Sequence, residues 1–270
     1  MIIIGEKLNG SIPSCAKAIA ARDEEYIKDI ARKETAAGAT YIDVCASVKD
    51  NEVETLKWMI DLVQEVTDLP ICVDSPDAHA LVEAIKFCKK PGIVNSVSGE
   101  GDKMDVIFPA IADTKWEVVA LLSDDTGIPK SAADRLRVFD KIMAKAKEYG
   151  IAPNRIHIDP LVEMLCAIDE GGISMVVEVM TKIREQYPTI HITGAISNIS
   201  FNLPARKMVN QAFCVLAMNA GLDSGVLDPT NRDLMGMIYA TEALLGIDDY
   251  CVEYIDAYRR DLFGKQPAKA

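Results

Sequence analysis

Short β-rich runs alternate with longer amphipathic stretches along the whole chain. The runs favour strands through their Ile and Val content, and eight of them lie at 2–5, 39–45, 69–74, 92–97, 117–123, 155–160, 191–197 and 224–229. The stretches between them carry apolar residues at helical spacing, and several end in a Gly or Lys stop signal, as at 147–150. The pattern predicts eight strand–helix units, then a terminal helix over 248–263 and a frayed tail over 264–270.

Eight such units without a linker or a break in composition favour a closed (β/α)8 barrel, a TIM barrel, over an open sheet. A doubly wound sheet would also alternate strands and helices, but it usually carries a GxGxxG turn, and the sequence has none. SGEGDKM at 98–104 lacks the third glycine and a GK[ST] sequence, so it is read as a plain turn. We expect residues 1–270 to form one domain of the α/β class.

The composition is that of a globular protein with a sizeable core. Hydrophobic residues make up 49% and charged residues 26% of the 270 positions, and no apolar run reaches the roughly 18 residues of a membrane span. The opening MIIIGEKLNG is read as a first strand, because it lacks the basic lead-in and cleavage site of a signal peptide. The net charge of −12 argues against nucleic acid and anionic membranes as partners. Seven cysteines without a CxxC pair fit free thiols in a reducing cytoplasm.

Polar residues gather where the expected strands end, which is where a TIM barrel builds its active site. One such Asp would be explained as a helix cap, but repetition at several strand ends indicates a ligand. None of these residues is His or Lys, so a Schiff base and a Ser–His pair are not available. The residues in question are Glu6, Asn9, Asp43, Cys45, Asp74, Ser75, Asn95, Ser96, Ser123, Asp124, Asp125, Asp159, Ser197, Asn198 and Asp228.

Two kinds of ligand fit these side chains. A hard metal ion would take oxygen ligands from Asp43, Asp74, Asp159 and Asp228. Alternatively, the carboxylates and amides would face a neutral ligand that is rich in N–H donors, since carboxylates accept strong charge-assisted hydrogen bonds. A fused heterocycle with an amidine-like edge, such as a pterin, offers that pattern.

Eight motifs follow one another along the chain: GEKLNG (5–10), IDV (42–44), CVDS (72–75), VNSVSGE (94–100), TGIPK (126–130), HIDPL (157–161), SNISFNLPAR (197–206) and GLDSGVLDP (221–229). In this order they closely resemble the methyltetrahydrofolate–corrinoid protein methyltransferases, over essentially the whole chain. That family shares a pterin-binding barrel with the folate module of cobalamin-dependent methionine synthase and with dihydropteroate synthase. The resemblance implies transfer of a methyl group between N5 of tetrahydrofolate and the cobalt of a corrinoid, and one site serves both directions.

The resemblance also implies a role for individual residues. Asn198 matches the asparagine that hydrogen-bonds near N5, and it is the expected catalytic residue. No acid is evident beside it, so solvent is the expected source of the proton at N5. The other expected binding residues are the pterin contacts Asp74, Asn95 and Asp159, the supporting acid Asp43, the basic Arg206, and the loop residues Ser197 and Gly194.

One position departs from the family pattern, because Cys45 stands where acetogenic members tend to have Asn. The departure leaves the pterin assignment in place. It means that the partner and the direction of methyl transfer need not be those of the acetogenic enzymes. The sequence places no His or Lys beside Cys45 that would activate it as a nucleophile.

The expected partner is a separate corrinoid protein that docks over the barrel mouth. A corrinoid module would carry Asp-x-His-x-x-Gly, whereas the nearest stretch, Asp77-Ala-His79, lacks the glycine. The family is typically homodimeric, and the helical AFCVLAMNAG (212–221) is a candidate interface. No metal is expected.

Three alternatives remain at this point. Dihydropteroate synthase shares the barrel and the pterin contacts, but it normally carries a GGEST-type loop and a Ser-Arg-Lys sequence, where this chain has DVCASVKD and SNISFNLPARK. A non-catalytic folate-binding protein would bind the ligand without turnover. A metal-dependent barrel hydrolase is disfavoured by the lack of histidines at the strand ends.

Overall fold

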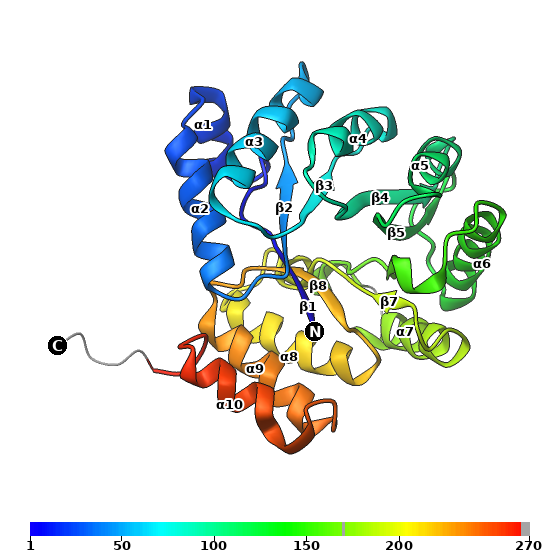
Figure 1. Cartoon of the computed structure of the whole chain (residues 1–270). Coiled ribbons are helices and arrows are strands. Elements are labelled where there is room, and N and C mark those ends of the chain that lie inside the picture. Colours follow the sequence, from blue (N-terminus) through cyan, green and yellow to red (C-terminus); the bar gives the residue numbers. More distant parts are fainter. Residues whose placement is uncertain (169–170, 266–270) are drawn as a thin grey trace.

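Eight parallel strands form a barrel that is surrounded by helices, as predicted (Figure 1). The computed structural model describes residues 1–168 and 171–265, and neighbouring strands follow the order β7-β6-β5-β4-β3-β2-β1-β8. Val226 N donates to Gly194 O at 3.0 Å, beside a parallel bridge between Ala195 and Val226, and this joins β7 to β8. The strands are β1 Ile2–Gly5, β2 Tyr41–Cys45, β3 Ile71–Asp74, β4 Ile93–Gly99, β5 Glu117–Asp124, β6 Ile156–Asp159, β7 His191–Ile192 and β8 Ser224–Leu227.

Amphipathic helices cover the outside of the barrel (Figure 1). Several begin at a side-chain cap, such as Ser131, whose Oγ accepts a hydrogen bond from Asp134 N at 3.1 Å. In the described part of the chain, no helix is long and apolar enough to cross a membrane. The helices are α1 Pro13–Ala21, α2 Glu24–Ala36, α3 Glu52–Val66, α4 Ala78–Ala84, α5 Lys103–Ile111, α6 Ala132–Glu148, α7 Ser174–Gln186, α8 Arg206–Asn219, α9 Arg232–Leu244 and α10 Val252–Arg259.

Two elements differ from the sequence-based expectation. The expected strand 191–197 is only the two-residue β7, and a 3-10 helix, η4 (Ile196–Ser200), follows it. Asn198 N donates to Ala195 O at 3.1 Å and Phe201 N donates to Asn198 O at 3.2 Å, so local turn bonds replace the strand pairing. The expected helix over 248–263 is divided into a 3-10 turn (Asp249–Cys251) and α10. Of the expected tail 264–270, residues 266–270 lie outside the described part of the chain.

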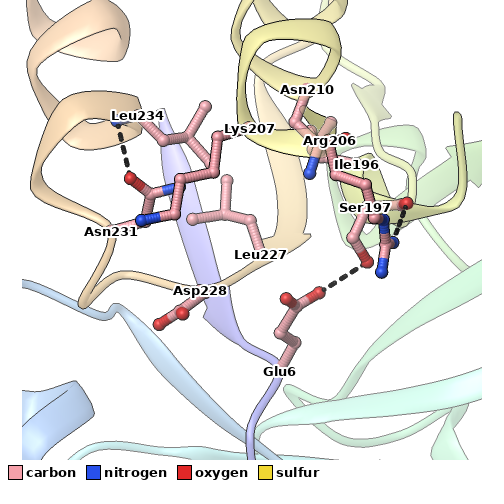
Figure 2. Close-up of a pocket in the computed structure, with 10 residues that line it drawn as sticks. All are labelled: Glu6, Ile196, Ser197, Arg206, Lys207, Asn210, Leu227, Asp228, Asn231 and Leu234. Carbon is pink, nitrogen blue, oxygen red and sulfur yellow. Dashed lines mark hydrogen bonds between the residues drawn. The ribbon is translucent and has the colours of Figure 1, made fainter. Parts of the chain in front are cut away.

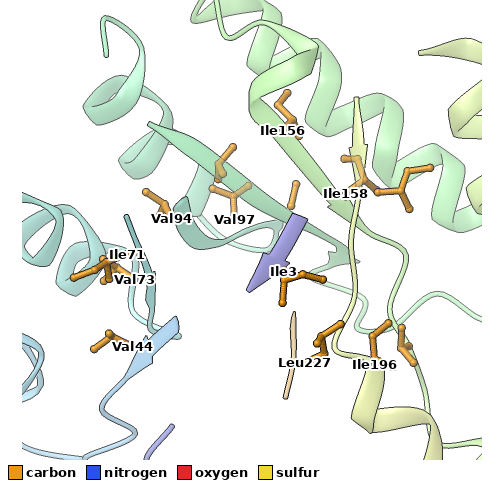
Figure 3. Close-up of a cluster of buried hydrophobic side chains, with 14 of the residues drawn as sticks. Ile3, Val44, Ile71, Val73, Val94, Val97, Ile156, Ile158, Ile196 and Leu227 are labelled. Atoms are coloured by element: carbon orange, nitrogen blue, oxygen red, sulfur yellow. The ribbon is translucent and has the colours of Figure 1, made fainter. Parts of the chain in front are cut away.

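The strands separate two apolar layers. The larger layer lies between the strands and the helices and includes Val44, Val73, Val94 and Ile158 (Figure 3). Burying each such side chain contributes roughly 1.5–3 kcal/mol relative to leaving it in water. The smaller layer fills the barrel interior and consists of Ile4, Cys72, Ile93 and Val119, with Ile2, Tyr41, Leu121 and Val226 packed against it.

Strand alternation carries four candidate residues into the barrel interior. Side chains two positions apart on a strand share a face, so Asp43, Asp74 and Asn95 face inward as Tyr41, Cys72 and Ile93 do. His157 on β6 points inward too, since its Nδ1 lies 3.0 Å from Ser224 Oγ on β8. Asp159, two residues further along β6, is therefore also directed inward.

Candidate active site

A cavity of about 420 Å³ opens at the C-terminal ends of β1 and β8, beside the 3-10 helix η4. We refer to it as the mouth cavity. Asn198 and Ser197 of η4 line one side of it, and Glu6 and Asn9 of the loop after β1 line another. Its remaining lining residues are Ser11, Ile12, Pro13, Ala195, Phe201, Arg206 and Val226.

An acid, Glu6, lies in the same cavity as Asn198, although none was evident beside Asn198 in the sequence. Ser197 Oγ donates to Glu6 Oε2 at 3.1 Å. Burial raises the pKa of Glu6, and the negative charge of Asp228 raises it further. The carboxyl of Glu6 therefore holds its proton to a higher pH than an exposed glutamate does. The sequence placed Glu6 at a strand end but gave no sign that it would meet Asn198.

Asp43, Asp74 and Asn95 come from three adjacent strands. Asp74 pairs in register with Cys45 on β2 and with Asn95 on β4. Asp43 is 1% exposed, and its Oδ1 has no hydrogen-bond partner among the described residues. Burial and the neighbouring Asp74 raise the pKa of Asp43 well above its usual range, and burial raises that of Asp74 to about 6. The Oδ1 atom of Asp43 is therefore a buried acceptor that a ligand with an N–H donor could satisfy.

Asp159 ends β6 and is held by its own loop. Leu161 N donates to Asp159 Oδ1 at 2.7 Å, and burial raises the pKa of this carboxyl to about 6. Gly194 allows the neighbouring loop to approach, because a Cβ at that position would lie 2.8 Å from Val162 Cγ2. The interpretation of Gly194 as a residue that shapes this loop therefore has a steric basis.

Arg206 braces the turn that carries Asn198. Its Nη2 donates to Ser197 O at 2.8 Å, its Nε donates to Ser200 Oγ at 3.0 Å, and its guanidinium lies 4.5 Å from the centre of the Phe201 ring. Arg206 thus fixes both ends of η4 while it lines the mouth cavity.

Several strand-end residues take part in local structure. Ser75 donates to Glu52 at 2.9 Å and Ser123 donates to Glu100 at 2.8 Å. Asp228 forms an ion pair with Lys7 at 2.8 Å. The described residues contain no group of three or more His, Cys, Asp or Glu side chains placed to hold a metal ion.

Cys45 is buried, with its Sγ 3.1 Å from Ser47 Oγ. Burial and the nearby Asp74 raise the pKa of this thiol. Cys45 therefore remains a thiol near neutral pH, which does not favour a nucleophilic role.

Comparisons with known proteins place this chain among the pterin-binding enzymes. The family model described as "Pterin binding enzyme" matches residues 6–228. A methylcorrinoid:tetrahydrofolate methyltransferase from Eubacterium limosum is 51% identical over 272 residues, which covers 100% of both chains. A methionine synthase from Mycobacterium leprae is 28% identical over 250 residues, which covers 86% of this chain and 21% of that protein.

Solved structures of dihydropteroate synthases share the fold. The enzyme from Vibrio fischeri superimposes with a TM-score of 0.65 at 17% identity, over 90% of this chain and 93% of that one. The enzyme from Yersinia pestis gives 0.63 at 16% identity, over 91% and 94%. At these identities the likeness supports the barrel fold and no particular reaction.

Proposed function

Because the chain belongs to the pterin-binding enzymes, we propose that it is a methyltransferase that moves a methyl group between a corrinoid and N5 of tetrahydrofolate. The observation that carries this proposal is the 51% identity, over the whole of both chains, to a methylcorrinoid:tetrahydrofolate methyltransferase. The name of that relative makes the methylcorrinoid the donor, and we adopt this direction as the physiological one.

The acceptors in the barrel interior fit the pterin ring. A pterin presents several N–H groups along one edge, and Asp74, Asn95 and Asp159 offer acceptors in the barrel interior. Asp43 has a buried Oδ1 that needs a donor. Hydrogen bonds to carboxylates in a buried site are strong enough to hold the ring in one orientation.

The protein's task at N5 is to orient the nitrogen and to manage a proton. A corrinoid supplies the cobalt that yields or accepts the methyl group. When N5 gains the methyl group it loses its proton, and when it gives up the methyl group it must take a proton. Asn198 is proposed to hydrogen-bond at N5 as charge changes there, and Glu6 is proposed to exchange the proton.

The corrinoid is proposed to arrive on a separate protein that docks over the mouth cavity, because that cavity is where Asn198 lies. Residues 1–270 are proposed to act as one domain in the cytoplasm. The seven cysteines, which are all unpaired, are in keeping with a reducing compartment.

We also propose that the protein is a homodimer. Large apolar side chains lie exposed along α9, the following 3-10 turn and α10, which are neighbours at one side of the barrel (Figure 1). Leu244 is 86% and Tyr250 is 95% exposed. A second copy of the same face would cover them by two-fold symmetry. The remaining members of this apolar face are Met237, Leu245, Ile247, Val252, Ile255 and Tyr258.

Substitution of Asn198 separates catalysis from binding. Asn198→Ala should lower the rate constant of methyl transfer about 100-fold, because it removes a hydrogen bond at the reacting nitrogen, while folate affinity changes by less than about 5-fold. Asp159→Asn, a buried pterin contact, should weaken folate affinity first. The measurements are single-turnover transfer rates and folate titrations. Equal losses of rate and affinity in Asn198→Ala would show that Asn198 is only a binding residue.

A further inference from the structure

A second cavity, of about 200 Å³, adjoins the mouth cavity (Figure 2). We refer to it as the side cavity. It lies between η4, the first turns of α8 and the loop from β8 to α9. Glu6, Ser197 and Arg206 line both cavities, so the two are neighbours. Its other lining residues are Ile196, Lys207, Asn210, Leu227, Asp228, Asn231 and Leu234.

The side cavity has two positive charges without acidic partners. Within residues 1–168 and 171–265, no Asp or Glu oxygen lies within 4.0 Å of a charged nitrogen of Arg206 or Lys207. The two acids of the cavity are engaged elsewhere, because Glu6 accepts from Ser197 and Asp228 pairs with Lys7. Both side chains are exposed, and on a chain with a net charge of −12 their two positive charges in one cavity favour an anionic ligand.

The side cavity also offers an unused acceptor. Asn210 Oδ1 is buried and has no hydrogen-bond partner among the described residues. A buried amide oxygen in this state needs an N–H donor. Leu227, Leu234 and Ile196 add an apolar wall beside these polar groups. The cavity therefore fits a ligand segment that combines an N–H group, a short aliphatic part and carboxylates.

We propose that the side cavity binds the glutamate tail of the folate, an inference that rests on the proposed function. This tail joins a benzoyl group through an amide N–H to an aliphatic side chain with two carboxylates. With the pterin held in the barrel, the tail leaves past Ser197, which borders both cavities. Lys207 and Arg206 pair with the carboxylates, and Asn210 accepts from the amide.

The test compares two ligands on two proteins. The ligands are 5-methyltetrahydrofolate and 5-methyltetrahydropteroate, which lacks the glutamate, and the variant is Lys207→Gln. Wild-type protein should bind the folate about 10-fold more tightly than the pteroate, or about 1.4 kcal/mol. Lys207→Gln should lose about 3- to 10-fold in folate affinity and none in pteroate affinity. Raising the salt concentration should weaken folate binding more in wild type than in the variant.

Lys130→Gln is the matched control, because Lys130 is an exposed lysine in the loop after β5 and lies outside both cavities. It should bind both ligands as wild type does. Equal affinities of wild type for the two ligands would overturn the inference, and so would equal losses for both ligands in Lys207→Gln. In either case an active enzyme would leave the proposed function standing, whereas a wild type without methyl transfer would contradict the proposed function itself.

Discussion

Glu6 and Asn198 line one cavity although they are far apart in the sequence. Their proximity depends on closure of the barrel, which pairs β1 with β8 and joins β7 to β8. Ser197 then donates to Glu6 Oε2 across the junction. Burial raises the pKa of Glu6, so its carboxyl exchanges a proton closer to neutral pH than an exposed glutamate would.

Glu6→Gln tests this role at the level of one residue. Gln can still accept the bond from Ser197 but cannot carry a proton, so the rate constant of transfer should fall about 10- to 100-fold with little change in folate affinity.

In wild type, transfer of the methyl group to folate needs the ionised form of Glu6 and should accelerate as pH rises through the raised pKa of Glu6. Transfer from folate needs the protonated form and should slow over the same range. Both pH dependences should disappear in the variant, and an unaltered pH–rate profile would rule Glu6 out as the proton carrier.

The sequence predicts residue types at the site better than their contacts. Asp43, Asp74, Asn95 and Asp159 could be assigned to the barrel interior because strand alternation and strand order are local properties. The pairing of Glu6 with Ser197, the brace that Arg206 gives to η4 and the unpaired state of Lys207 depend on loop conformations. No local pattern encodes those.

At the level of elements, β1 and α2 fit together through a glycine and a buried acid. Glu34 of α2 is fully buried, and its Oε1 accepts from Lys7 N at 2.9 Å. A Cβ at Gly5 would lie 2.6 Å from the Glu34 carboxyl, so only glycine leaves room for it. The bond fixes the loop after β1, which carries Glu6 into the mouth cavity.

The pKa of Glu34 predicts how stability depends on pH. Burial raises the pKa of this carboxyl to about 8, from an ordinary value of 4.5. The native state therefore binds an extra proton between pH 4.5 and 8, and stability falls through this window by roughly 1.4 kcal/mol per pH unit. The side chain in Glu34→Gln cannot ionise, so the variant should not lose stability over this window. The free energy of unfolding of the variant minus that of wild type should therefore increase from pH 4.5 to 8. Denaturant titrations at several pH values measure it, and a pH-independent difference would contradict the assignment.

The seventh strand shows where prediction of elements fails. The apolar run 191–197 has the composition of a full strand, yet β7 ends at Ile192. Beyond it, Gly194 and turn bonds within η4 determine the chain path, and they place Asn198 over the cavity instead of along the barrel wall. The first six strands and β8 form longer ladders, with register shifts only between β4 and β5, and the periodicity predicts each of them.

At the level of the whole molecule, the two ends of the barrel have different roles. The end opposite the mouth cavity carries a network around the buried His157, in which His157 Nε2 lies 2.7 Å from Glu117 Oε2 and Tyr41 donates to Glu117 Oε1 at 3.3 Å. Burial lowers the pKa of His157, so the network is neutral at the histidine. The mouth cavity lies at the other end, where the strands of a TIM barrel carry its active site.

The apolar face on α9 and α10 predicts self-association. Sedimentation should give twice the mass of the chain at micromolar concentration. Leu244→Asp combined with Tyr258→Asp should weaken the dimer at least about 10-fold, because each charge would be buried in the interface. The control is Ile128→Asp, which changes an exposed apolar residue in the loop after β5. It should leave the sedimenting mass unchanged. A wild type that sediments as a monomer would refute the homodimer.

The most direct test of the central claim follows the cobalt absorbance without oxygen. Wild-type protein is mixed with methylcob(III)alamin and tetrahydrofolate in one experiment, and with cob(I)alamin and methyltetrahydrofolate in the other. The proposed function predicts protein-dependent interconversion of the two cobalt spectra in at least one direction, with a matching change in methyltetrahydrofolate and a rate lowered by Asn198→Ala. Spectra that stay constant in both directions, with folate bound, would contradict it.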